Sequence, residues 1–103
     1  MRVAYLLLVA CHSQPTPAPP PPGTEAWSEG TVATVEQCRV GISNIWTRDG
    51  GMSATFSVLE ADGGERDAFV WVGSDFDVCG KTIHVVRIDY PTPGKVFITR
   101  SSP

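Results

Sequence analysis

Apolar and polar residues alternate along most of the chain after residue 26, in short runs separated by glycine-rich turns. The run 52–59 shows this most clearly, because Met52, Ala54, Phe56 and Val58 fall on one face with serine or threonine between them. Strict alternation is typical of a strand with one buried and one exposed face. The same pattern predicts about seven short strands, over residues 31–35, 38–46, 52–59, 68–72, 76–79, 82–89 and 96–99.

Two of these runs depart from simple alternation. The run 68–72, AFVWV, is apolar at every position, which predicts a central strand covered on both faces. In the run 82–89, TIHVVRID, the apolar positions change parity between Val85 and Val86. Such a change indicates a β-bulge or burial on both sides of the strand.

The segments between the runs carry turn residues. Asp49-Gly50 is a strong hairpin signal, and the stretches 61–64 and 91–94 are also typical of turns. No stretch of ten residues shows helical periodicity flanked by capping residues. We therefore expect an all-β domain, a small antiparallel β-sandwich or barrel of about seven short strands.

The first 26 residues have a different composition. After Arg2, residues 3–10 are all apolar or aromatic, a run much shorter than the roughly 20 residues that span a bilayer. Its length and position match the hydrophobic region of a signal peptide. Residues 12–26 contain six of the nine prolines, which favours an extended polyproline II stalk.

The sequence LVAC at residues 8–11 resembles the lipobox of bacterial lipoproteins, with an aliphatic residue, a tolerant position, a small residue and then cysteine. The resemblance covers residues 1–11 and implies cleavage before Cys11, whose sulfur would carry a diacylglycerol. Two or three acyl chains anchor a protein firmly to a membrane. We expect a signal peptide at 1–10, a lipidated linker at 11–26 and a β domain at 27–103.

The resemblance also implies a location. In lipoproteins of this type an aspartate after the cysteine often marks retention in the inner membrane, and this chain has His12 there. We expect attachment to the outer membrane, with the domain facing the periplasm or the cell surface.

The chain has three cysteines, and lipidation of Cys11 would leave Cys38 and Cys79 as an even pair. An exported protein sits in an oxidising compartment, where such a pair forms a disulfide. A loop of about 40 residues closed in this way contributes roughly 4 kcal/mol in the chain-entropy model. A metal site or a catalytic thiol are the alternatives, but the two cysteines lack the paired spacing of a zinc site.

Charge and motifs limit the function classes. The net charge is −3 and basic residues are scattered, which argues against nucleic acid as a partner. His84 is the one histidine in the predicted domain, so no Ser-His-Asp site is evident, and we expect His84 to be a partly buried strand residue. We expect neither enzymatic activity nor a cofactor.

A few residues are candidates for binding. Asp75 and Asp77 are weak candidates for a metal site, because calcium needs six to eight oxygen ligands. We expect Trp46 and Trp71 in the core and Trp27, next to the linker, partly exposed. The candidate binding residues are Trp27, Asp62, Glu65 and Tyr90.

Two function classes follow from these features. The first is a lipid-anchored binding or scaffolding module that contacts another envelope protein. The second is an inhibitor or immunity-type lipoprotein that blocks an envelope hydrolase. The second class needs a protruding loop, for which 60–67 and 89–95 are the candidates.

Overall fold

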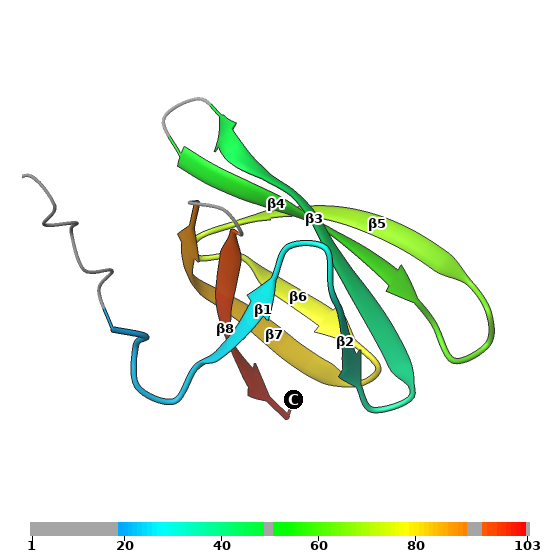
Figure 1. The fold of residues 1–103 in the computed structure, drawn as a ribbon. Coiled ribbons are helices and arrows are strands. Elements are labelled where there is room, and N and C mark those ends of the chain that lie inside the picture. Colours follow the sequence, from blue (N-terminus) through cyan, green and yellow to red (C-terminus); the bar gives the residue numbers. More distant parts are fainter. Residues whose placement is uncertain (1–18, 49–50, 91–93, 103) are drawn as a thin grey trace, which may run out of the picture.

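The computed structural model describes residues 19–48, 51–90 and 94–102, which form two antiparallel sheets of four strands each (Figure 1). None of these residues lies in a helix, so the described part contains no helix able to cross a membrane. The strands are β1 (Glu25–Ser28), β2 (Val32–Val35), β3 (Cys38–Arg48), β4 (Gly51–Leu59), β5 (Glu65–Trp71), β6 (Asp75–Val78), β7 (Lys81–Asp89) and β8 (Lys95–Ser101).

The strand order is β1-β8-β7-β6 in one sheet and β2-β3-β4-β5 in the other. Two turns, which we call corners, carry the chain from one sheet to the other, and each forms a backbone hydrogen bond with a strand. At the β1–β2 corner the Gly30 N–H donates to the Ile42 carbonyl at 2.7 Å, and at the β5–β6 corner the Gly73 N–H donates to the Val85 carbonyl at 2.9 Å. The all-β antiparallel fold is therefore confirmed, as a sandwich with two bonded corners.

All seven predicted runs form strands, and β1 is an eighth. The β1 strand begins at Glu25, two residues before the expected start of the domain, and pairs with β8. This strand was not predicted because four residues next to a proline tract carry too little alternation to identify it.

The core lies between the two sheets and is centred on aromatic rings. The Phe56 ring lies 5.4 Å from that of Trp27 and 5.9 Å from that of Phe76, measured between centroids. Both pairs are tilted or edge-on, which aromatic rings prefer over a face-to-face stack. Aliphatic residues from both sheets fill the space around these rings.

A disulfide joins the two sheets, as predicted. Cys38 begins β3, and Cys79 lies in the turn between β6 and β7, with 6.0 Å between their Cα atoms. Cys79 and Gly80 both have positive φ, 48° and 81°, in a two-residue hairpin loop. Positive φ at both loop positions is the pattern of a type I′ turn, which matches the twist of the flanking strands.

The predicted irregularity in residues 82–89 is also confirmed. The register of β7 against β8 shifts between Val85 and Arg87, which is the mark of a bulge. The change of parity in the sequence therefore identified a real backbone feature.

Three predictions about aromatic residues are wrong. The run 68–72 is not a central strand, because β5 is the last strand of its sheet and Trp71 is 57% exposed. Trp46 is 49% exposed instead of buried, while Trp27 is 4% exposed instead of partly exposed. A register shift in β3 turns Trp46 outwards, and β5 lies at the edge of its sheet. Trp27 lies in β1 of the other sheet, and its ring packs against Phe56 in the core.

Candidate functional site

A β-bulge in β3 turns Trp46 to the outside of the domain. Ser43 pairs with Thr55 and Trp46 pairs with Ser53, so two residues of β3 oppose a single residue of β4. The extra residue reverses the alternation beyond it. As a result Ile45 enters the core at 2% exposure and Trp46 faces outwards.

Asn44 makes this bulge possible. Its φ is 50°, a left-handed conformation that asparagine adopts more readily than most residues and that β-branched residues disfavour. The Asn44 side chain is exposed at the bulge. The residue therefore has a backbone role and also offers its amide to a ligand.

Glu29, in the turn between β1 and β2, holds the bulge through a hydrogen bond. Its carboxylate oxygen Oε2 accepts a hydrogen bond from the Ile45 N–H at 2.9 Å, and its own N–H donates to the Gly94 carbonyl at 2.9 Å. Gly94 is buried so close to the Ile45 side chain that a Cβ at this position would lie 3.0–3.2 Å from its atoms. These three residues fix the backbone at the end of β3.

The outer face of β4 and β5 extends the aromatic surface. Phe69 lies opposite Thr55 and Trp71 lies opposite Ser53, and both aromatic side chains are more than half exposed. Ser53 and Thr55 are themselves buried, at 7% and 8% exposure. The polar face of β4 was expected to be exposed, which holds for Ser57, whereas Ser53 and Thr55 lie between larger neighbours on β3 and β5.

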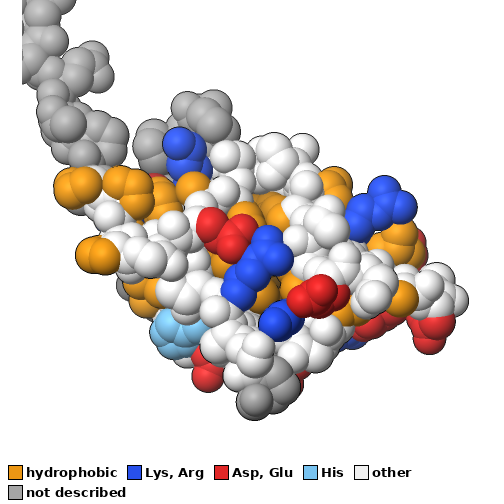
Figure 2. Space-filling view, turned by 90° about the horizontal axis from the view of Figure 1, so that it is seen from below, with side chains coloured by type: hydrophobic (Ala, Val, Ile, Leu, Met, Phe, Trp, Pro, Cys, Tyr) orange, Lys and Arg blue, Asp and Glu red, His pale blue; other side chains and the backbone are white. Residues whose placement is uncertain are grey.

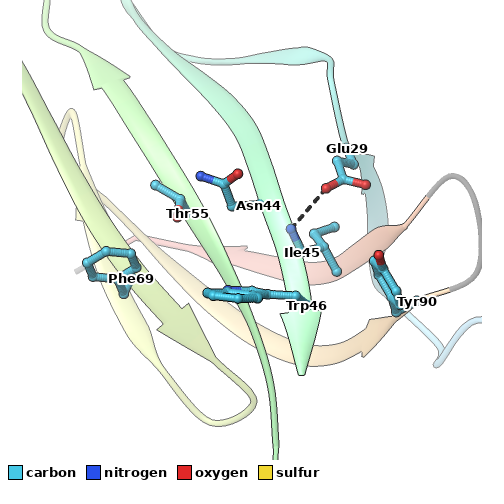
Figure 3. Close-up of a pocket in the computed structure, with 7 residues that line it drawn as sticks. All are labelled: Glu29, Asn44, Ile45, Trp46, Thr55, Phe69 and Tyr90. Atoms are coloured by element: carbon cyan, nitrogen blue, oxygen red, sulfur yellow. Dashed lines mark hydrogen bonds between the residues drawn. The ribbon is translucent and has the colours of Figure 1, made fainter. Parts of the chain in front are cut away.

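Beside these residues the surface has a hollow of about 520 Å³. Figure 3 shows the Trp46 indole edge-on between Phe69 and Tyr90, with one face towards the side where Asn44 and Thr55 lie. We call this site the aromatic hollow; its lining residues are Glu29, Asn44, Ile45, Trp46, Thr55, Phe69 and Tyr90.

No family model, curated protein or solved structure matches this chain. The aromatic hollow is therefore interpreted from its own geometry and chemistry.

The four candidate binding residues lie in different places. Tyr90 lines the aromatic hollow and is 57% exposed, whereas Trp27 belongs to the core. Asp62 lies in the β4–β5 turn, where its Oδ1 accepts the Gly64 N–H at 2.9 Å. Glu65 lines a smaller hollow of about 310 Å³ near that turn. The structure brings none of the other three to Tyr90.

The candidate metal residues lie on the outside of the other sheet. Asp75 Oδ1 lies 2.6 Å from His84 Nδ1, and Asp77 Oδ1 accepts a hydrogen bond from the Thr82 hydroxyl at 3.0 Å. His84 is exposed, so the expectation of a partly buried histidine is wrong. Figure 2 shows one face of the domain, on which acidic and basic side chains are interspersed.

Among the described residues, one group of three potential metal ligands lies close together, formed by Cys38, Glu60 and Cys79 within 4.8 Å. Its two sulfurs form the disulfide. Thiolates are the form that binds metal, so the oxidised protein does not offer these ligands. The residue predicted to be lipidated, Cys11, lies outside the described residues.

Glu25, which lies away from the hollow, has a lowered pKa. The hydrogen bonds from Arg100 are the main cause of the lowered pKa of Glu25. Partial burial raises this pKa, whereas a hydrogen bond from Trp27 and the positive charge of Arg100 lower it further. The Arg100 Nε and a terminal nitrogen reach the two oxygens of Glu25 at 2.6 and 2.9 Å. This pair ties β1 to β8.

Sequence reasoning missed most of the hollow, namely Glu29, Asn44, Trp46 and Phe69. A signal for the bulge was present, because buried Ile42 and Ile45 differ in parity, as Val85 and Val86 do in β7. An asparagine between them is a suitable residue for positive φ. No comparable signal links Glu29 to β3, since that contact joins residues distant in the sequence.

Proposed function

We propose that this protein is a lipid-anchored binding module of the cell envelope and that the aromatic hollow and its rim are its ligand surface. The observation that carries the proposal is a set of exposed rings from β3, from β5 and from the residue that follows β7, namely Trp46, Phe69, Trp71 and Tyr90. Tyrosine and tryptophan supply much of the binding energy at protein surfaces, because they bury large areas at low entropic cost. An apolar surface of this kind marks a contact site.

The proposed anchor is Cys11, and the proline-rich linker would hold the module away from the membrane. Its last residues contact the domain, because the Arg87 guanidinium donates to the Pro19 carbonyl at 2.9 Å. The same guanidinium makes two 3.0 Å bonds to Asp89 and lies over the Phe97 ring. An attachment of this kind would give the stalk a defined direction relative to the domain.

The anchor is tested by membrane fractionation of the full chain and its Cys11→Ala variant. We expect the unmodified chain in the membrane fraction with incorporated radiolabelled fatty acid, and the variant in the soluble fraction without label. A variant that still pellets with membranes contradicts the lipid anchor.

The ligand surface is tested by photo-cross-linking in intact cells. A benzophenone amino acid replaces Trp71, at the rim of the hollow, or Val32 as the matched control on the same sheet; both positions are highly exposed. We expect a covalent adduct from position 71 and none from position 32. Equal labelling at both positions, or none at either, contradicts the proposed surface.

An inhibitor of an envelope hydrolase is the second candidate function. Figure 1 shows the β4–β5 turn projecting at the opposite side of the view from the described start of the chain. Two backbone hydrogen bonds hold this turn: the Glu60 N–H donates to the Gly64 carbonyl at 2.7 Å, and the Gly63 N–H donates to the Glu60 carbonyl at 3.1 Å. A rigid projecting turn suits insertion into a cleft. Cross-linking from position 62 instead of position 71 would favour this function.

A further inference from the structure

We infer that the aromatic hollow binds an uncharged oligosaccharide, an inference that rests on the proposed function and names its ligand class. The hollow has a volume of about 520 Å³, within the range of small-ligand sites of roughly 300–1,000 Å³. Three features of its lining favour a sugar chain over other ligands. They are a stacking surface, interleaved hydrogen-bonding groups and, among the described lining residues, the absence of cationic side chains.

The Trp46 indole provides the stacking surface. Trp46 is 49% exposed, and Figure 3 shows its ring between Phe69 and Tyr90, with one face towards the side where Asn44 and Thr55 lie. Aromatic faces carry partial negative charge. A pyranose ring presents one face of C–H bonds, which carry partial positive charge, and this face packs well against an indole.

Hydrogen-bonding groups lie beside the rings and suit hydroxyl ligands. The Asn44 amide has two donors and an acceptor, while the Thr55 and Tyr90 hydroxyls both donate and accept. The Glu29 carboxylate, one oxygen of which holds the Ile45 N–H, adds acceptor capacity. A purely apolar anchor would leave these groups desolvated without partners, whereas sugar hydroxyls satisfy them.

The charge of the lining selects an uncharged ligand. Among its seven residues there is one carboxylate, Glu29, and no lysine, arginine or histidine. An anionic ligand would meet this carboxylate without a compensating cation among the described lining residues. A neutral glycan meets no such repulsion.

The surface continues beyond the hollow, which suits a chain of sugars. Trp46, Ser53 and Trp71 lie in register across β3, β4 and β5. Two strand spacings separate the outer pair by roughly 10 Å at the backbone. Trp71 would therefore offer a second stacking position next to the first.

The test measures binding of the full chain to four probes, by calorimetry and by tryptophan fluorescence. The neutral probes are chitotetraose and cellotetraose, the anionic probe is tetragalacturonate, and an uncharged apolar peptide represents a protein ligand. We expect at least one neutral glycan to bind at least tenfold more tightly than tetragalacturonate and the peptide.

Three variants locate the binding. Trp46→Ala is expected to weaken neutral-glycan binding at least tenfold, and Trp71→Ala several-fold. Asn44→Gly keeps a residue that accepts positive φ and removes the amide, so it should weaken binding several-fold with the same circular dichroism spectrum. Val32→Ala, an exposed apolar residue outside the hollow, should leave affinity unchanged.

The inference is overturned if no neutral glycan binds, if tetragalacturonate binds as tightly, or if Trp46→Ala and Val32→Ala bind alike. The photo-cross-linking experiment separates this failure from that of the proposed function. A protease-sensitive adduct from position 71 without glycan binding leaves the module a protein binder. No adduct and no glycan binding removes both proposals.

Discussion

Glu29 Oε2 accepts a hydrogen bond from the Ile45 backbone N–H at 2.9 Å, across the gap between the end of β1 and the bulge in β3. The bulge interrupts the β3–β4 ladder at this N–H, so the carboxylate takes the place of a strand partner. This contact supports the backbone conformation that places Ile45 inside and Trp46 outside. The candidate site thus depends on a residue that lies distant in the sequence from the strand it supports.

Replacement of Glu29 tests this support. Glu29→Ala is expected to lower the free energy of unfolding by about 1.5–3 kcal/mol, the usual range for a hydrogen bond to a charged group. Glu29→Gln keeps an oxygen acceptor and should recover part of the loss. Urea denaturation measures both variants, and equal stability of Glu29→Ala and the unmodified chain would contradict the role of this contact.

Gly94 provides an independent probe of the same corner. A Cβ at this position would lie 3.0–3.2 Å from three atoms of the Ile45 side chain. Gly94→Ala therefore requires the buried Ile45 side chain to shift by a few tenths of an ångström, and we expect a cost at the low end of overpacking, about 1 kcal/mol. Thermal denaturation should show a lower midpoint for Gly94→Ala. Gly30→Ala is the control, because a Cβ at Gly30 would have no atom within 4 Å and the variant reports only the strain of the positive φ.

The sequence predicted the general fold well, because seven strands, one bulge and the disulfide follow from alternation, parity and cysteine number. It assigned the tryptophans to the wrong environments. A strand such as β5 that presents aromatic residues on its outer face has the same apolar run as a strand covered on both faces. Residues 38–46 looked continuous, although the parity of Ile42 and Ile45 differs. Contacts between residues distant in the sequence, such as that of Glu29, leave no local pattern.

Phe56 and Trp71 should differ sharply in their effect on stability. Phe56 is fully buried between Trp27 and Phe76, so Phe56→Ala is expected to cost about 3–5 kcal/mol. Trp71 is 57% exposed, and Trp71→Ala should change stability by no more than about 0.5–1 kcal/mol. Chemical denaturation of the two variants compares them directly, and similar losses would place Trp71 in the core after all.

Glu25 gives the protein a pH dependence with a defined sign. Its pKa in the folded protein lies below the ordinary value of 4.5, mainly through hydrogen bonds from Arg100. The unfolded chain therefore binds a proton first as the pH falls, and stability is lost from about pH 4.5 downwards. Glu25→Gln should reduce this loss of stability at low pH. The difference in the free energy of unfolding should be less than about 1 kcal/mol, because the Glu25–Arg100 pair is exposed. An unchanged slope would contradict the pairing.

The central claim is that the β3 bulge places Trp46 at the surface while Trp27 is buried, and acrylamide quenching of single-tryptophan proteins tests it most directly. The W27F/W71F protein retains Trp46, and the W46F/W71F protein retains Trp27. We expect strong quenching and red-shifted emission for Trp46, at 49% exposure, and weak quenching with blue-shifted emission for Trp27, at 4%. A protected Trp46 together with a readily quenched Trp27 would contradict the bulge and the site built on it.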